Sequence, residues 1–184
     1  MLLAAAVCPH PPLLVPEVAA GAAYETDDLR AACRAAVATL PEDTVVVGTA
    51  QAVEIGLWLL PYATPLLIPR DLPPSDAAAL GRTLDTPGLL VMGDGSARRS
   101  LAAPGYLDPR AEPYDAAVAR ALRAADVHAL LAIDPALDDD LLVAGRAAWQ
   151  VLAGAAESGE WQGEVLYDAA PYGVGYFVAT WARA

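Results

Sequence analysis

Short continuous apolar runs alternate along the chain with segments whose apolar residues recur at helical spacing. The runs Leu2–Val7, Thr44–Gly48 and Leu89–Met92 end at or near proline or glycine and are typical of buried strands. Between the first two runs, the apolar positions that follow Thr26 predict a helix that ends at Pro41. Strand, helix and strand in this order favour a βαβ unit with a right-handed crossover and a parallel sheet.

The same alternation continues to the end of the sequence. The further elements that we predict are helices over Ser75–Leu84, Asp115–Ala125 and Asp138–Ala156 and strands over Leu66–Ile68, Glu164–Tyr167 and Gly175–Trp181. One irregular stretch, Ala97–Pro113, is longer than most loops and is a candidate functional loop. We therefore expect one α/β domain over residues 1–184, with an open, mostly parallel sheet flanked by helices.

Charge and composition narrow the classes of partner. The chain has 11 basic and 23 acidic residues, a net charge of −12, and every basic residue is arginine. An acidic surface repels polyphosphate and anionic lipid, so we expect no nucleic-acid partner and no membrane partner. Hydrophobic residues make up 56% of the chain, which excludes disorder. Five aromatic residues suggest an exposed patch that suits a homodimer, namely Trp58, Trp161, Tyr176, Phe177 and Trp181.

The sequence also indicates the cellular compartment in which the protein is expected. Its apolar runs, such as Ile55–Tyr62, are far shorter than the roughly 20 residues that a bilayer requires. The N-terminal residues lack the basic region of a signal peptide, and two cysteines are too few for a disulfide framework. We expect a reduced, cytoplasmic protein.

Candidate site residues are sought just after the strands, because ligands of open α/β sheets bind at the carboxyl ends of the strands. His10 is the strongest candidate, because an imidazole between prolines has a restricted orientation and could ligate a metal or transfer a proton. The alternative is a partly buried histidine bonded to a backbone carbonyl. The full set of candidates for lining a cleft is His10, Gln51, Asp94, Ser96, Arg98 and Tyr172.

Other polar residues have a structural interpretation. Asp94 and Arg98 are as consistent with an ion pair as with an anion site, because the phosphate-loop pattern around Gly93–Ser96 is incomplete. The acidic run Asp138–Asp140 is placed at a predicted helix start, where carboxylates complement the helix dipole, rather than at a chelating site. His128 is assigned to the core.

Taken together, a set of motifs resembles one family. They are Cys8-Pro9-His10-Pro11-Pro12, the Gly48 turn, Gly93-Asp94-Gly95-Ser96-Ala97-Arg98, Ala144-Gly145-Arg146 and Pro171-Tyr172-Gly173-Val174-Gly175-Tyr176. In this order they are similar to the class III extradiol ring-cleavage dioxygenase superfamily, the group around the catalytic subunit of protocatechuate 4,5-dioxygenase and its Memo relatives. The resemblance implies a ferrous iron held by two histidines and one carboxylate, and a catechol bound through both hydroxyls.

Carried over by position, the resemblance places His10 on the first iron-ligand histidine. The second ligand histidine of the family lies in a loop that corresponds to Gly48–Ala52 here, and this loop contains no histidine. The histidine that moves protons in the family enzymes corresponds to Ala97, and a cysteine typical of the Memo group corresponds to Ala144. The resemblance therefore implies a divergent member that has lost the iron site, has no cofactor, and binds a small aromatic or other small molecule, or a protein, in the old cleft.

The alternative is an active non-haem metal-dependent ring-cleavage dioxygenase with a rearranged site around His10. Glu54 or Cys8 would then supply a second ligand, with Asp94 as a further carboxylate, to Fe(II) or Zn(II).

Overall fold

The computed structural model describes residues 1–18 and 26–184, and in these residues it forms one six-stranded sheet. The strand order is β3-β2-β4-β1-β6-β5. Neighbours among β3, β2, β4 and β1 run parallel, whereas β6 is antiparallel to β1 and β5 is antiparallel to β6. The strands are β1 (Ala4–Cys8), β2 (Thr44–Gly48), β3 (Thr64–Leu67), β4 (Gly88–Met92), β5 (Trp161–Ala169) and β6 (Tyr176–Arg183). The predicted α/β class is confirmed, with a mixed sheet.

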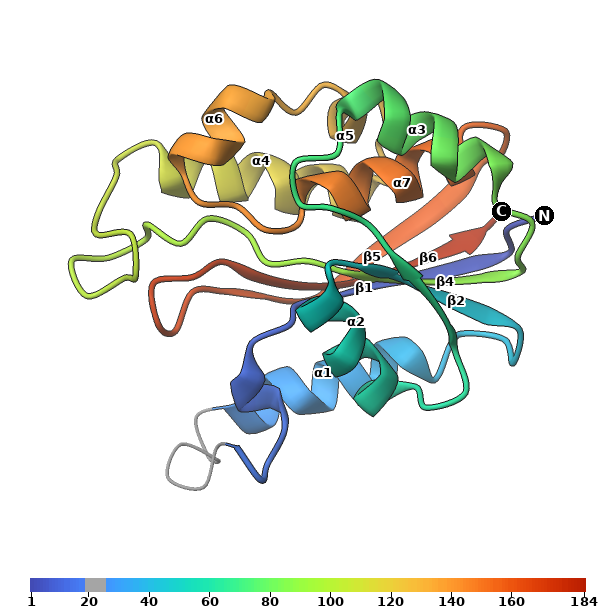
Figure 1. Ribbon diagram of the computed structural model, residues 1–184, viewed down its shortest axis with the longest axis horizontal. Helices are drawn as coiled ribbons and strands as arrows, with labels where there is room; N and C mark the ends of the chain where they lie inside the picture. The colour runs from blue at the N-terminus through green and yellow to red at the C-terminus, as the bar shows by residue number, and fades with distance from the viewer. Residues whose placement is uncertain (19–25) are drawn as a thin grey trace.

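Helices cover both faces of this sheet (Figure 1). The first face carries α1 (Asp27–Val37) and α2 (Ala50–Leu59), and a short 3-10 helix spans Pro12–Leu14. The opposite face carries α3 (Pro74–Thr83), α4 (Ala111–Ala124), α5 (Val127–Leu131), α6 (Pro135–Asp140) and α7 (Arg146–Ala156). None of the helices in the described ranges is long and apolar enough to span a membrane.

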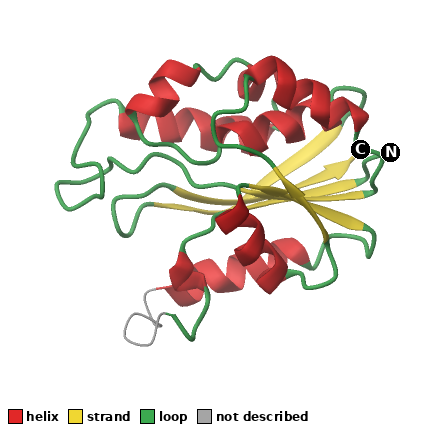
Figure 2. Cartoon of the chain, viewed as in Figure 1, coloured by secondary structure: helices red, strands yellow, loops and turns green. Residues whose placement is uncertain are grey.

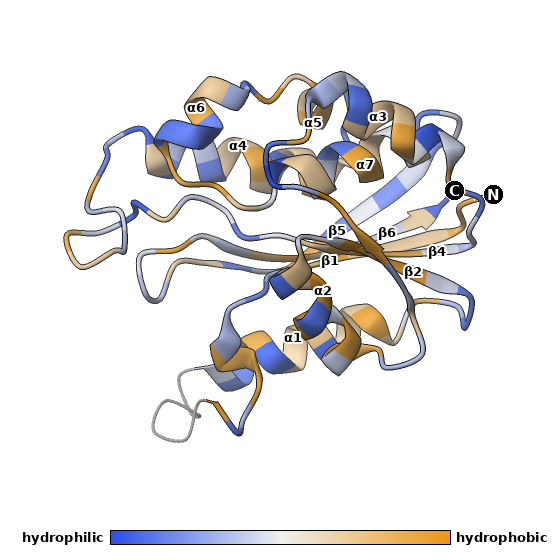
Figure 3. Cartoon of the chain, in the orientation of Figure 1, coloured by the Kyte–Doolittle hydropathy of each residue, from blue (hydrophilic) through white to orange (hydrophobic). Residues whose placement is uncertain are grey.

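Burial on both faces explains why the central strands are apolar without alternation. In β2, Val46 packs into the core cluster on the α1 and α2 side, and its neighbour Val47 packs into the cluster on the other side. Figure 3 shows the same pattern as apolar colour along the middle strands. Tyr176, Phe177 and Trp181 of β6 are also core residues, so the apolar patch predicted from the aromatic residues does not include them.

Helix α2 was not predicted, because it lacks a polar face. Its sequence is apolar almost all round, so the helical period does not stand out. The Thr49 hydroxyl caps it by accepting a hydrogen bond from the Ala52 amide at 3.4 Å. Gly56 lets the helix approach the sheet, since a Cβ there would lie 3.0 Å from Met92 Cγ. The residues after β2 therefore form a helix rather than a loop.

The predicted helix over Asp138–Ala156 is two helices. Asp138–Asp140 forms the second half of α6, which begins at Pro135, so the expected position of this acidic run near a helix start is confirmed for Asp138, in the first turn, and not for the two residues after it. The chain turns at Leu142, whose φ of 57° is left-handed, and α7 begins at Arg146. His128 is an exposed residue of α5 and not part of the core.

A buried ion pair explains the break between α6 and α7. Arg146 Nε donates to Asp138 Oδ2 at 3.2 Å, and both side chains are almost wholly buried. The Tyr114 hydroxyl donates to the other Asp138 oxygen at 3.2 Å, and Arg146 also donates to Gln150 Oε1 at 2.9 Å. A helix continuing through these residues could not bring Asp138 back to Arg146 with this geometry, so the pair and the turn form together.

Burial raises the pKa of Asp138 to about 6, although Arg146 opposes the rise. The folded state therefore holds this proton more tightly than the unfolded state, and the resulting stability is lost as pH rises through the folded pKa. We predict that the free energy of unfolding of the wild type, relative to Asp138→Asn, falls between about pH 4 and pH 6 by up to about 3 kcal/mol. Urea denaturation across this range measures the difference.

The control is Asp139→Asn, which removes the same charge from an exposed position of the same helix. Its pH profile is expected to follow the wild type. A constant difference between the wild type and Asp138→Asn from pH 4 to pH 7 would contradict the prediction.

Candidate functional site

The carboxyl ends of β1 and β4 meet at one edge of the sheet, from which the following loops and the turn between β5 and β6 extend (Figure 2). The loop after β4 is tied to its neighbours by backbone hydrogen bonds. Gly93 N donates to Cys8 O at 2.9 Å, Gly95 N to Gly175 O at 2.7 Å, and Ala144 N to Asp94 O at 3.2 Å. Three segments far apart in sequence thus hold this loop in place.

His10 and Asp94 form a pair at this edge. The His10 amide donates to Asp94 Oδ1 at 2.7 Å, and the imidazole Nδ1 lies 3.4 Å from the same oxygen. His10 is only 7% exposed, and its Nδ1 is buried without a hydrogen bond of good geometry. No described residue hydrogen-bonds to the second ring nitrogen, Nε2. The backbone amide of His10 therefore ties this residue to Asp94, the imidazole Nδ1 lies close to the same carboxylate without a hydrogen bond, and Nε2 is the ring nitrogen that a ligand could contact.

The electrostatics of Asp94 follow from its position. Burial raises the pKa of this carboxyl, while the nearby imidazole and the His10 amide oppose the rise. The Asp94 carboxylate lies 3.4 Å from Nδ1 and places a hydrogen-bond acceptor beside that nitrogen. The arrangement is chemically suited to a hydrogen bond, or a proton transfer, between Nε2 and an acidic hydroxyl of a bound molecule.

Two tyrosines lie in the same region. Tyr176, the first residue of β6, is 4% exposed, and burial raises the pKa of its hydroxyl, with further contributions from the negative charge of Asp94 and from Tyr172. Tyr172 is partly buried against the core cluster that contains Tyr176. The sequence pattern indicates Tyr172 as a site residue through its place in the turn, but not Tyr176. Tyr176 could have been identified from the sequence because it lies at the start of a strand at the same sheet edge.

The buried carboxylate of Asp115, in α4, holds the loop that follows β4 in place. It accepts hydrogen bonds from Ser96 N at 2.9 Å, from Ser96 Oγ at 2.7 Å and from Arg99 Nη1 at 3.0 Å. Burial raises the pKa of Asp115, and these three donors oppose the rise. A side chain at Gly175 would collide with this carboxylate, which explains glycine there. Ser96 is fully buried in this contact and supports the loop.

The remaining residues that the sequence predicted for the site are not paired with His10. Gln51 and Glu54 are exposed on the first turns of α2, and within the described residues neither forms a hydrogen bond or an ion pair with His10. Arg98 does not form the ion pair with Asp94 that the sequence suggested. Its side chain runs beside Gly105, and its Nε is buried with no partner among the described residues. Asp94 instead receives the His10 amide.

The residues described here do not complete the iron site that the resemblance implies. Cys8 is fully buried, and contact with the thiol of Cys33 and burial raise the pKa of its own thiol, so it is directed into the core on the α1 side. Within residues 1–18 and 26–184, no three His, Cys, Asp or Glu side chains lie close enough to hold a metal ion together. His10 and Asp94 supply two donors, whereas the site of the family takes three.

Comparison with known proteins adds no assignment: no protein-family model and no curated protein matches this chain.

The hydrogen bond between Ser96 and Asp115 is expected to contribute measurably to the stability of the folded protein. Ser96→Ala removes one donor from a buried carboxylate, so we expect the free energy of unfolding to fall by about 2 kcal/mol. Chemical denaturation measures it. The control is Ser75→Ala, at an exposed position of α3, which is expected to change stability by less than about 0.5 kcal/mol. Equal stability of the two variants would contradict the role of Asp115.

Proposed function

We propose that this protein is a metal-free relative of the class III extradiol dioxygenases that binds a small aromatic molecule at the carboxyl edge of its sheet. The observation that carries the proposal is the His10–Asp94 pair just after the first strand, in which a partly buried carboxylate accepts a hydrogen bond from the His10 amide and lies 3.4 Å from the imidazole Nδ1. The sequence motifs that resemble the family support it, because His10 stands at the place of a ligand histidine in those enzymes.

The proposed ligand is a phenol or catechol. Its hydroxyl would share a proton with Nε2 of His10, and the ring would lie near the aromatic side chains of Tyr172 and Tyr176. The negative charge of Asp94 beside the ring favours a ligand that donates a hydrogen bond to Nε2, as a phenolic hydroxyl can. Binding without ring cleavage is proposed because the described residues around His10 supply only Asp94 as a further metal donor.

The first test is catechol binding, followed by proton–nitrogen NMR of the imidazole signals. Catechol is expected to shift the signals of His10, and His10→Ala is expected to weaken binding about tenfold or more, the equivalent of one good hydrogen bond to the ligand. The matched control is His128→Ala, which removes the chain's other imidazole from an exposed site. Equal affinity for catechol in both variants would overturn the proposal.

The second test is metal content, measured by inductively coupled plasma mass spectrometry after anaerobic incubation with ferrous iron. We expect far less than one iron or zinc per chain, because two donors hold a divalent transition metal weakly. One iron per chain that is lost in His10→Ala would instead support the ring-cleaving alternative. Glu54→Ala and Cys8→Ala would then identify the additional ligand.

A further inference from the structure

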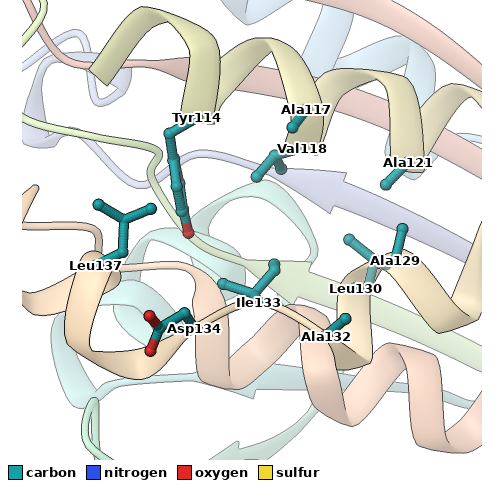
Figure 4. Close-up of a pocket in the computed structure, with 10 residues that line it drawn as sticks. All are labelled: Tyr114, Ala117, Val118, Ala121, Ala129, Leu130, Ala132, Ile133, Asp134 and Leu137. Atoms are coloured by element: carbon teal, nitrogen blue, oxygen red, sulfur yellow. The ribbon is translucent and has the colours of Figure 1, made fainter. Parts of the chain in front are cut away.

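A concave site lies away from the sheet edge, between α4 and the segment that forms α5 and α6 (Figure 4). Its volume is about 290 Å³, close to the lower end of the range for small-molecule sites and well above a cavity that holds benzene. Four alanines contribute to its wall, namely Ala117, Ala121, Ala129 and Ala132. Their small side chains leave open a space that larger residues would fill.

The walls of this pocket are held at a fixed spacing. On one side, Tyr114 of α4 reaches across and donates its hydroxyl proton to Asp138 of α6 at 3.2 Å. On the other, the Gln150 side-chain amide donates to the carbonyl oxygens of Leu130 at 3.3 Å and Leu131 at 3.4 Å. These buried contacts join α4, α5, α6 and α7. The pocket is therefore preformed, so a ligand would not have to order its walls.

The polar groups of the pocket are hydrogen-bond acceptors. The Tyr114 hydroxyl has committed its proton to Asp138, so its oxygen offers only lone pairs to a ligand. Asp134 lines the same pocket from an exposed position, and its carboxylate uses Oδ1 to cap α6 through the Ala136 amide at 2.9 Å. Figure 4 shows the Tyr114 hydroxyl directed toward the segment that carries Ile133 and Asp134. The net charge of −12 adds to the preference for a cation.

We propose that this pocket binds a small primary amine with an apolar body, of the size of benzylamine. The apolar body would fill the space lined by the alanines, Val118 and Ile133, displacing water that makes few hydrogen bonds there. The ammonium group would donate to Asp134 and to the Tyr114 oxygen. This site shares none of its residues with the His10–Asp94 pair, so the inference stands independently of the catechol proposal.

Isothermal titration calorimetry with three matched probes tests the ligand class. Benzylamine is expected to bind saturably, about threefold or more tightly than benzyl alcohol, and benzoate is expected not to bind. This order reflects one partly exposed ion pair added to the burial of the same ring. Absence of saturable benzylamine binding, or equal affinities for the three probes, would overturn the proposal.

Two pairs of variants locate the binding. Ala117→Phe places a ring in the pocket from an exposed position of α4 and is expected to abolish benzylamine binding, whereas Ala116→Phe, also exposed, lies outside the lining and should leave it unchanged. Asp134→Asn keeps a side chain that can cap α6. This variant is expected to weaken the binding of benzylamine about threefold and to leave the binding of benzyl alcohol unchanged. Asp139→Asn changes the same net charge outside the pocket and should have no effect. Wild-type affinity in Ala117→Phe would refute the assigned site.

Discussion

The buried carboxylate of Asp115 is the interaction on which the shape of the sheet edge depends. A carboxylate in the protein interior is costly unless donors surround it, and here Ser96 and Arg99 supply three. Those donors belong to the loop after β4, so satisfying the charge also places the loop. Gly95 and Gly175 can approach this carboxylate closely because they have no side chain. Asp94, adjacent to this anchored segment, is thereby held against His10.

The parallel part of the fold could be predicted because its strands are buried on both faces and therefore read as unbroken apolar runs. Helix α2 could not, since a helix that is apolar all round carries no period to detect. The break before α7 was also missed. It depends on Asp138, Tyr114 and Arg146 meeting in space, and the sequence between Asp138 and Arg146 carries no proline to mark a helix end.

For the candidate site, the sequence identified the residues whose position follows from strand order alone. His10 and Asp94 each come just after one of two neighbouring parallel strands, so they were expected at one edge, and they are in contact there. Ser96 was expected to face a ligand but is buried on Asp115, a residue 19 positions away whose partner no local pattern reveals. Long-range pairing of polar side chains is the part of the site that requires the folded structure.

The placement of β1 also has a consequence for how the chain folds. β1 lies inside the sheet, and one of its two neighbours is β6, so Ala4 pairs with Ala182. Until β6 joins, one edge of this wholly apolar strand has no partner, and closing so long a loop is slow. An unpaired apolar edge is a template for strands of other molecules. Refolding yield should therefore fall as protein concentration rises, with intermolecular β-structure in the material that is lost.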